Sequence, residues 1–334
     1  MPNNISNSEF YNWLNNIKNK DFSKKSVLLI GSGNIANYYA DAILKLGISN
    51  ILVISKSDKK LKEFCKKFDL RGISGRYEKN LPNIETFDLV IIATPMTSLI
   101  PTAISSIEHG QKKLLIEKPG AINKKELMDF QKISKNIKVR VAYNRAVYPN
   151  LIKLRTILDN EKITSCRFTI TERVNEIMEL KKDPKILQKW GIANTLHVLS
   201  IVCNMIGFPE KISSFASGKL PWHESGSIFV GSGISKKRIP FSYHGDWESK
   251  GGWGIEIYTT ENVYRIKPLE NISYLSKKGI WESIPFECAF SDTKFGIIEE
   301  IAIMLSNEKY LEDYLPTVSH AIELIELAET IFHY

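Results

Sequence analysis

The sequence predicts a doubly wound α/β domain with a parallel sheet, followed by an α+β domain with an antiparallel sheet. Three observations lead to this prediction. Short apolar runs alternate with helical segments from Ser26 to Tyr143. A glycine-rich turn directly follows the first of these runs. After about residue 146 the hydrophobic period changes to two, which is typical of strands.

Residues 1–25 are expected to form a helical extension, because Phe10, Trp13, Leu14 and Ile17 recur at helical spacing and can pack as one stripe. The first domain is predicted over 26–145. Its short apolar runs are expected to be strands buried on both faces of the sheet. These runs are Val27–Ile30, Ile51–Ile54, Leu89–Ala93, Leu114–Ile116 and Val139–Tyr143. The helices expected between them include 34–46, 61–68 and one ending near residues 109–110.

The second domain is predicted over 146–334 and begins with a helix at Pro149–Leu158. Several period-two segments then predict strands of one antiparallel sheet. The segments are 165–174, 227–233, 238–246, 254–260 and 263–267. Helices are expected at Asn194–Ile206 and, near the C-terminal end, at 294–306 and 316–332.

Composition indicates an ordinary soluble globular protein, with 43% hydrophobic and 25% charged residues in 334. No apolar run approaches the roughly 18 residues needed to cross a bilayer, so no membrane partner is expected. The first 25 residues contain no apolar core of the kind found in signal peptides. A cytoplasmic location is therefore the expectation.

The formal charge of +8 arises from 45 basic and 37 acidic residues. The lysines are scattered and form no dense basic block, which argues against nucleic acid as a partner. An anionic small molecule and a merely lysine-rich solvated surface both agree with this charge. The four cysteines (Cys65, Cys166, Cys203 and Cys288) form no CxxC pair, so neither a zinc site nor a disulfide framework is expected.

The first predicted strand runs directly into residues 31–36, whose sequence GSGNIA has the pattern GxGxxA. Gly31 permits a tight turn, Gly33 lets a pyrophosphate approach the backbone, and the small Ala36 lets helix and strand pack closely. The N-terminus of the following helix offers N–H groups and a positive dipole end to phosphates. At a strand-to-helix junction this pattern predicts a Rossmann domain that binds a dinucleotide.

The second strand ends in Ser55 and Lys56, where NAD-preferring sites usually carry an Asp or Glu for the ribose hydroxyls. A hydroxyl followed by an ammonium group suits a 2′-phosphate. These residues therefore favour NADP over NAD as the cofactor. The alternative is that Lys56 is only a solvated loop residue and that Asp58 serves the ribose.

Two further segments follow strands: Ala93-Thr94-Pro95, and Leu115-Ile116-Glu117-Lys118-Pro119. With the glycine-rich turn and Ala142-Tyr143-Asn144-Arg145 at the domain boundary, they resemble the Gfo/Idh/MocA oxidoreductase family. The resemblance implies a Rossmann domain followed by an open, mostly antiparallel sheet used for substrate binding and oligomer contacts, so a homodimer or homotetramer is expected. It also implies hydride transfer between a nicotinamide and a carbon bearing a hydroxyl or carbonyl, often on a sugar or cyclitol.

By this resemblance, Lys118 and His197 are the predicted catalytic residues. An ammonium group in a partly desolvated site can hydrogen-bond a developing alkoxide. An imidazole has a pKa suited to general acid–base catalysis at neutral pH. Family members commonly place an aspartate four residues before this histidine, whereas here the position holds Ala193. Asn194, on the same helical face as His197, could hold substrate or the imidazole.

The remaining predicted site residues are grouped by role. The residues predicted to contact the cofactor are Gly31, Gly33, Asn34, Ile35, Ala36, Ser55, Lys56, Thr94, Pro95, Glu117 and Lys118. The residues predicted to contact the substrate are Lys118, Asn144, Arg145, Asn194, His197, Trp222 and His244. Trp222 and His244 belong to aromatic clusters that could hold a sugar face or equally serve packing. No metal ligand set is predicted.

Three functions remain open at this point. The first is an NAD(P)-dependent oxidoreductase acting on a sugar, nucleotide-linked sugar or cyclitol, in a setting such as surface carbohydrate biosynthesis. The second is a glycosidase-like enzyme that uses bound NAD with no net redox change. The third, prompted by Ala193, is a non-catalytic dinucleotide-binding sensor.

Overall fold

The computed structural model describes residues 5–334 except 82–83 and 181. The chain forms two compact units. The first contains residues 12–147 and 288–322, and the second contains residues 6–11, 148–287 and 323–334. The first unit thus includes a C-terminal stretch that the sequence-based boundary at 145/146 assigned to the second domain.

The first unit is built on a six-stranded parallel sheet with strand order β3-β2-β1-β4-β5-β6. This is the doubly wound order, in which the strand order reverses between β1 and β4 and leaves a ligand crevice at the carboxyl ends of these strands. The strands are β1 (Ser26–Ile30), β2 (Asn50–Ser55), β3 (Arg71–Ser74), β4 (Leu89–Ile92), β5 (Lys113–Glu117) and β6 (Lys138–Ala142). The parallel sheet predicted from the sequence is confirmed.

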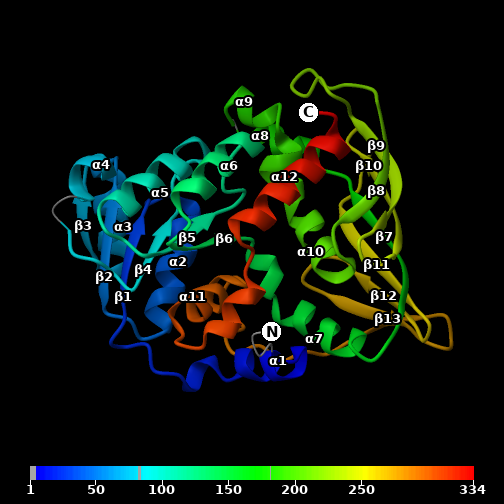
Figure 1. The fold of residues 1–334 in the computed structure, drawn as a ribbon, viewed down its shortest axis with the longest axis horizontal. Coiled ribbons are helices and arrows are strands. Elements are labelled where there is room, and N and C mark those ends of the chain that lie inside the picture. Colours follow the sequence, from blue (N-terminus) through cyan, green and yellow to red (C-terminus); the bar gives the residue numbers. More distant parts are fainter. Residues whose placement is uncertain (1–4, 82–83, 181) are drawn as a thin grey trace. The chain divides into compact units, whose positions relative to one another are not determined.

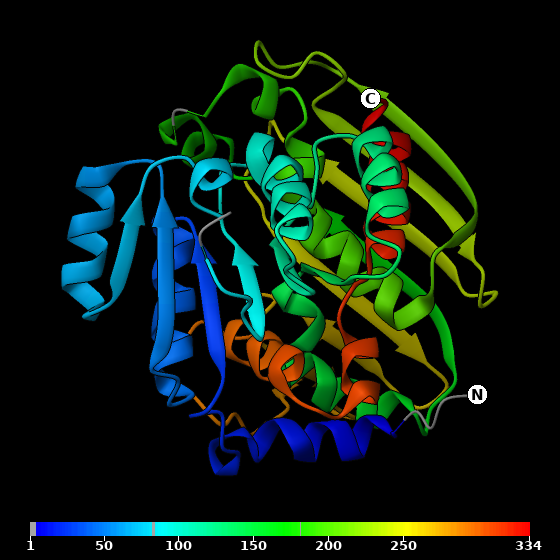
Figure 2. The same ribbon diagram turned by 60° about the vertical axis from the view of Figure 1, so that its left-hand side comes forward.

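Helices cover both faces of this sheet (Figures 1 and 2). The α-helices are α2 (Asn34–Lys45), α3 (Asp58–Phe68), α4 (Tyr77–Asn80), α5 (Leu99–Glu108), α6 (Lys124–Ile133) and α11 (Ile297–Leu305). The short 3-10 helices are η3 (Met96–Ser98), η4 (Asn144–Val147) and η6 (Lys309–Tyr314). At the N-terminal end, α1 (Asn7–Asn15) and η1 (Ile17–Asn19) bury Phe10, Leu14 and Ile17, the stripe expected from the sequence.

The central strands were predictable because both their faces are buried, which demands a continuous apolar run. Val27–Ile30 and Leu89–Ile92 are at most 1% exposed. The edge strand β3 was not predicted. All four of its residues are exposed, so its sequence carries no apolar run.

The second unit is built on an eight-stranded mixed sheet with order β14-β13-β12-β11-β7-β10-β9-β8. Neighbouring strands are antiparallel except β7 and β10, which run parallel. The prediction of a mostly antiparallel sheet is confirmed. The strands are β7 (Ile163–Ile170), β8 (Pro209–Ser217), β9 (Ile228–Ser235), β10 (Pro240–Asp246), β11 (Trp253–Thr259), β12 (Val263–Ile266), β13 (Ile272–Leu275) and β14 (Trp281–Ser283).

The helices of this unit are α7 (Pro149–Leu158), α8 (Val174–Glu179), α9 (Pro184–Leu187), α10 (Leu196–Ile206), preceded by a π-helical turn η5 (Gly191–Thr195), and the C-terminal part of α12 (Val318–Phe332). Both α10 and α12 lie along one face of the sheet (Figure 2). On that face Phe168 and Tyr243 pair across β7 and β10 and are nearly fully buried. On the opposite face the residues alternate with these and are largely exposed.

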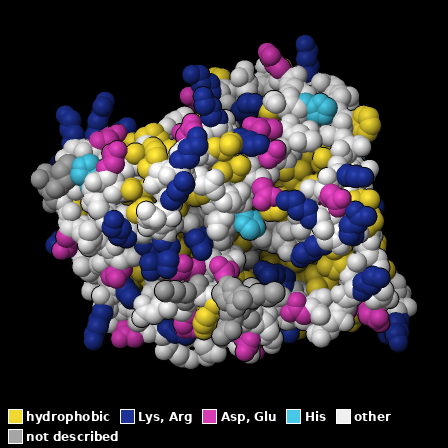
Figure 3. Space-filling view, viewed as in Figure 1, with side chains coloured by type: hydrophobic (Ala, Val, Ile, Leu, Met, Phe, Trp, Pro, Cys, Tyr) yellow, Lys and Arg dark blue, Asp and Glu magenta, His cyan; other side chains and the backbone are white. Residues whose placement is uncertain are grey.

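Charged side chains are mixed over the face of the molecule that Figure 3 displays. Lysines and arginines are interspersed with aspartates and glutamates and do not gather into one basic patch. Within the described residues, no helix is both long and apolar enough to span a membrane.

Candidate functional site

The glycine-rich turn is held tightly between neighbouring strands of the first unit. Gly31 N donates to Ile54 O at 2.8 Å, and Ala93 N donates to Ile30 O at 2.8 Å. Gly31 has a φ of +128°, and a Cβ there would lie 2.4 Å from Ala93 O. Only glycine satisfies both the conformation and the close approach, as the sequence pattern required.

The start of α2 offers an open cradle for phosphate groups. Gly33 is the N-cap residue and has no side chain to satisfy the first N–H groups of the helix. Apart from the adjoining backbone, no heavy atom of the described residues lies within 4 Å of a Cβ built on Gly33. Asn34 and Ile35 begin the helix, and Ala36 is fully buried where α2 packs on β1. This geometry fits the pyrophosphate of a dinucleotide.

Thr94 adds a second observation in favour of a ligand. It follows β4, and its hydroxyl oxygen is buried without a hydrogen-bond partner among the residues described. Buried hydroxyl groups rarely lack a partner, and a polar group of a bound cofactor would supply one here. Pro95 is exposed beside it and starts η3.

The end of β2 carries the residues predicted to select the cofactor. The Ser55 hydroxyl lies 2.7 Å from that of Ser32 in the glycine-rich turn. Lys56 is exposed, and its Nζ lies 5.8 Å from the ring centroid of Tyr77. Asp58, the alternative partner for the ribose, instead pairs with Lys62 at 2.8 Å one turn along α3.

Glu117 is the last residue of β5, and Lys118 follows it at the start of the next turn. Both residues are half-buried, and the peptide bond between Lys118 and Pro119 is cis. Tyr39 Oη donates to Glu117 Oε1 at 2.6 Å and also lies 3.0 Å from Glu300 Oε1. Burial raises the pKa of Glu117, an effect that the Tyr39 hydrogen bond partly offsets. Burial together with the charge of Glu117 raises the pKa of Glu300 well above its usual value.

Asn144 and Arg145 follow β6 in the short helix η4. Asn144 is 7% exposed, and its amide donates to the carbonyl of Phe295 at 2.9 Å, ahead of α11. Arg145 is half-buried. The first-unit candidates therefore follow β1, β2, β4, β5 and β6, so they share the carboxyl edge of one sheet, where this fold binds its ligands.

In the second unit, His197 lies in the first turn of α10 and is only 7% exposed. Its ring centroid lies 6.1 Å from that of Trp253, at an interplanar angle of 52°. Asn194 belongs to the π-helical turn just before α10, and its amide donates to Glu172 Oε2 at 3.0 Å. The Asn194 amide, which we expected to contact the substrate or the imidazole, is thus hydrogen-bonded to Glu172.

The structure does not bring Trp222 and His244 together with His197. Trp222 stacks on Trp247 with centroids 6.0 Å apart, within an aromatic cluster around the buried His223. His244 is exposed and alternates along β10 with the buried Tyr243, so it lies on the sheet face opposite α10. Both residues remain untested predictions for substrate contact, but their geometry favours packing and surface roles.

Sequence reasoning missed Tyr39, Glu172 and Glu300 as members of these clusters. Glu172 carried a usable signal, since a carboxylate at the end of a predicted strand is unusual. The other two lie within helices, where no pattern marks the partner that tertiary packing brings. Within the described residues, no group of three or more His, Cys, Asp or Glu side chains could hold a metal ion.

A doubly wound sheet with a glycine-rich phosphate cradle at its switch point defines a dinucleotide-binding protein. Residues 25–145 match the model of the family described as "Oxidoreductase family, NAD-binding Rossmann fold". The first unit's Rossmann segment therefore matches the Gfo/Idh/MocA family of oxidoreductases, as its motifs had suggested.

Known proteins resemble the chain in sequence and in fold. Oxidoreductase P35 of Formosa agariphila is 30% identical over 140 residues, which are 40% of this chain and 43% of that protein, so less than half of the relative is matched. An oxidoreductase from Agrobacterium radiobacter, solved with NAD⁺, L-tartaric acid and magnesium, has a TM-score of 0.75 at 16% identity, covering 93% of this chain and 96% of that one. UDP-N-acetylglucosamine 3-dehydrogenase of Acidithiobacillus ferrooxidans has a TM-score of 0.70 at 12% identity, covering 92% and 97%. The two structural likenesses show the shared fold.

Proposed function

We propose that this protein is an NADP-dependent oxidoreductase that interconverts a hydroxyl and a carbonyl on a sugar, nucleotide-linked sugar or cyclitol. The observation that carries the proposal is the open cradle at Gly31–Ala36 on the same sheet edge as Lys118. The match of residues 25–145 to the oxidoreductase family supports the cofactor and the reaction class. The fold shared with a dehydrogenase of a nucleotide-linked sugar supports the substrate class.

The nicotinamide of the bound cofactor would accept or supply the hydride. Gly31, Gly33 and the first turn of α2 would hold the pyrophosphate, and Thr94 would donate to the cofactor through its hydroxyl. The absence of a carboxylate at Ser55 and Lys56, together with the engagement of Asp58 by Lys62, supports NADP over NAD.

Lys118 and His197 would have different roles in the reaction: Lys118 would stabilise charge and His197 would transfer a proton. The Lys118 ammonium, half-buried on the turn after β5, would stabilise the developing alkoxide. His197 would take the hydroxyl proton in the oxidation direction and return it in the reduction direction. Its burial limits competition from water, which strengthens hydrogen bonds to the reacting oxygen.

The proposed assembly is a homodimer or homotetramer that uses the exposed face of the eight-stranded sheet. Phe215 on β8 pairs with Val230 on β9, and Ile234 lies on the same face of β9. These side chains are 66%, 36% and 39% exposed. An apolar patch on a sheet face without covering helices among the described residues suits a second copy of the chain.

The first experiment is to release any cofactor from the purified protein and identify it by mass spectrometry, then to titrate NADPH and NADH by fluorescence. We expect micromolar affinity for NADPH. A protein with no affinity for either nucleotide would overturn the proposal. Candidate sugars and cyclitols can then be screened for NADP reduction at 340 nm.

Two lysine variants separate catalysis from binding. Lys118→Met should retain cofactor affinity but lower turnover by about 100-fold or more, because a charge-stabilising donor is lost. Lys125→Met changes an exposed lysine on α6 and should leave both quantities unchanged. Turnover of a glycoside without external nucleotide consumption would instead favour the redox-neutral alternative.

A further inference from the structure

Glu172 is a buried carboxylate to which the proposed reaction assigns no role. It lies just beyond the end of β7 and is 4% exposed. Thr195 Oγ1 donates to its Oε1 at 2.6 Å, Trp253 Nε1 donates to the same oxygen at 3.2 Å, and Asn194 Nδ2 donates to Oε2 at 3.0 Å. Both carboxylate oxygens are therefore engaged by donors from two other elements.

All three donors are neighbours of His197, either along the chain or in space. Asn194 and Thr195 close the π-helical turn and precede His197 by three and two residues. Trp253, the first residue of β11, has its ring centroid 6.1 Å from that of His197. Glu172 thus ties the backbone that leads into His197 to the indole that lies against its imidazole.

The π-helical turn before α10 requires stabilising contacts from other elements. A π-helical turn departs from the regular hydrogen-bond pattern and is held by its surroundings. Ala193, four residues before His197, has only a methyl group as its side chain, so it supplies no carboxylate at that position. The carboxylate of Glu172 reaches the same turn from β7. Removing a carboxylate from water is costly, and three good hydrogen bonds offset that cost only while the donors keep this arrangement.

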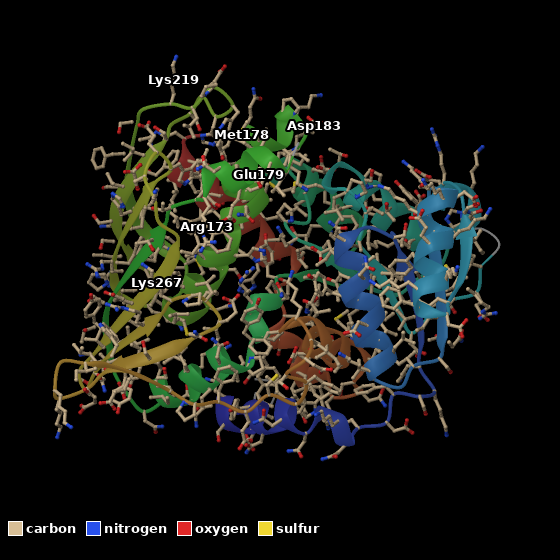
Figure 4. All side chains as sticks on the ribbon, turned by 180° about the vertical axis from the view of Figure 1, so that it is seen from behind. Arg173, Met178, Glu179, Asp183, Lys219 and Lys267 are labelled. Atoms are coloured by element: carbon tan, nitrogen blue, oxygen red, sulfur yellow. The ribbon has the colours of Figure 1, made fainter. Side chains whose placement is uncertain are left out.

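The segment that follows Glu172 turns outward. Figure 4 labels Arg173, Met178 and Glu179 along and beside α8, which comes directly after this point in the chain. Arg173 pairs at 3.1 Å with Glu176, and both side chains are about two-thirds exposed. The segment therefore carries two glutamates of opposite exposure: Glu172 is buried and Glu176 is exposed.

We infer that Glu172 is a positioning residue for His197: it fixes the turn at residues 191–195 and the ring of Trp253, and through both it fixes the imidazole. This inference rests on the proposed role of His197. It deepens that role by identifying which carboxylate orients the histidine in a chain that has Ala193 on the helix.

The test uses the full-length protein labelled with ¹⁵N-histidine, with the His197 signal assigned by its absence in His197→Asn. Glu172→Gln retains the shape of the side chain. Its amide has one oxygen that can accept a hydrogen bond, whereas both oxygens of the carboxylate accept them. We expect its His197 signal to shift and its pH titration to change, because the donors of the π-helical turn and of Trp253 lose one of their acceptors. Glu176→Gln, the outward control, should leave the signal and titration unchanged.

A second variant covers the case in which Glu172→Gln does not fold. Thr195→Val conserves shape, removes the 2.6 Å hydrogen bond and should also shift the His197 signal. A folded variant of either kind with an unaltered His197 spectrum and titration would overturn the inference. NADPH titration of the same samples separates the two proposals, because loss of the proposed function would appear as absent cofactor binding in the wild-type protein.

Discussion

Tyr39 Oη lies 2.6 Å from Oε1 of Glu117, the glutamate next to the proposed catalytic Lys118. The same hydroxyl lies 3.0 Å from Glu300 Oε1, so one phenol joins α2, the end of β5 and α11. A phenol has one proton to donate. Two buried carboxyl groups around it are accommodated when one of them keeps a proton, and burial favours Glu300 for this.

Replacing Tyr39 by Phe should lower the free energy of unfolding by about 2 kcal/mol, because it leaves buried carboxyl oxygens without their donor. Urea denaturation followed by circular dichroism measures this. Tyr38→Phe is the matched control, since Tyr38 is 47% exposed and the loss of its hydroxyl leaves no buried carboxyl group of this cluster without a donor. Equal denaturation midpoints for the two variants would contradict the prediction.

The stability of the protein should fall as the pH rises through neutrality. Burial raises the pKa of Glu299 from 4.5 to about 7, and the pKa values of Glu117 and Glu300 are raised as well. Between the unfolded and folded values the native state binds more protons than the unfolded chain, so raising the pH destabilises it.

Glu299→Gln should reduce this loss. The amide can still accept the hydrogen bond from Gly296 N, but it has no proton to lose. We expect the stability difference between pH 5 and pH 8 to shrink by about 2–3 kcal/mol, measured by urea denaturation at each pH. Glu108→Gln, at an exposed position, should leave the difference as in the wild type. An unchanged pH dependence in Glu299→Gln would refute the prediction.

The two glycines of the turn should respond differently to alanine. Gly31→Ala should destabilise the fold by about 2 kcal/mol or more, because of its positive φ and the 2.4 Å approach to Ala93 O. Gly33→Ala has a permitted φ of −85° and open space, so stability should change by less than about 1 kcal/mol. Its methyl group should nevertheless weaken NADPH binding about 10-fold or more by blocking the backbone. Thermal melts and fluorescence titrations check the pair, and wild-type affinity in a folded Gly33→Ala would count against the cradle.

Cofactor preference should depend on Lys56. Lys56→Ala should weaken NADPH binding about 10-fold and leave NADH binding unchanged, because only the former carries a 2′-phosphate. Ser55→Asp should further favour NADH by adding a ribose acceptor and repelling the phosphate. Lys59→Ala, an exposed lysine on α3, is the control. A parallel loss of both affinities in Lys56→Ala would show that it does not discriminate.

Assembly should depend on the exposed sheet face. Phe215→Glu should convert the proposed oligomer to a monomer, because a charge would be buried in an apolar contact. Ile280→Glu alters another exposed apolar residue, 58% accessible between β13 and β14, and should preserve the oligomer. Light scattering gives both masses. A wild-type protein that is already monomeric would contradict the assignment of this face.

Local sequence determined the elements whose pattern depends only on their own residues. Val27–Ile30 is apolar because both faces of β1 are buried, and the turn at 31–36 needs glycine for its own backbone geometry. These features, with the motifs after β4, β5 and β6, were enough to predict the Rossmann sheet, its ligand edge and the family. The exposed strand β3 was missed because a strand without a buried face has no apolar period, and β8 was missed because its inward face is only half-buried.

Tertiary structure alone decided which distant side chains meet. Tertiary packing places α11 in the first unit, where Tyr39 lies between Glu300 and Glu117. In the second unit it places Glu172 within hydrogen-bonding distance of Thr195 and Trp253. It also separated His244 from His197 by the two faces of one sheet. Such contacts depend on packing between elements far apart in the chain, and the energy of a buried polar group depends on partners that no local pattern specifies.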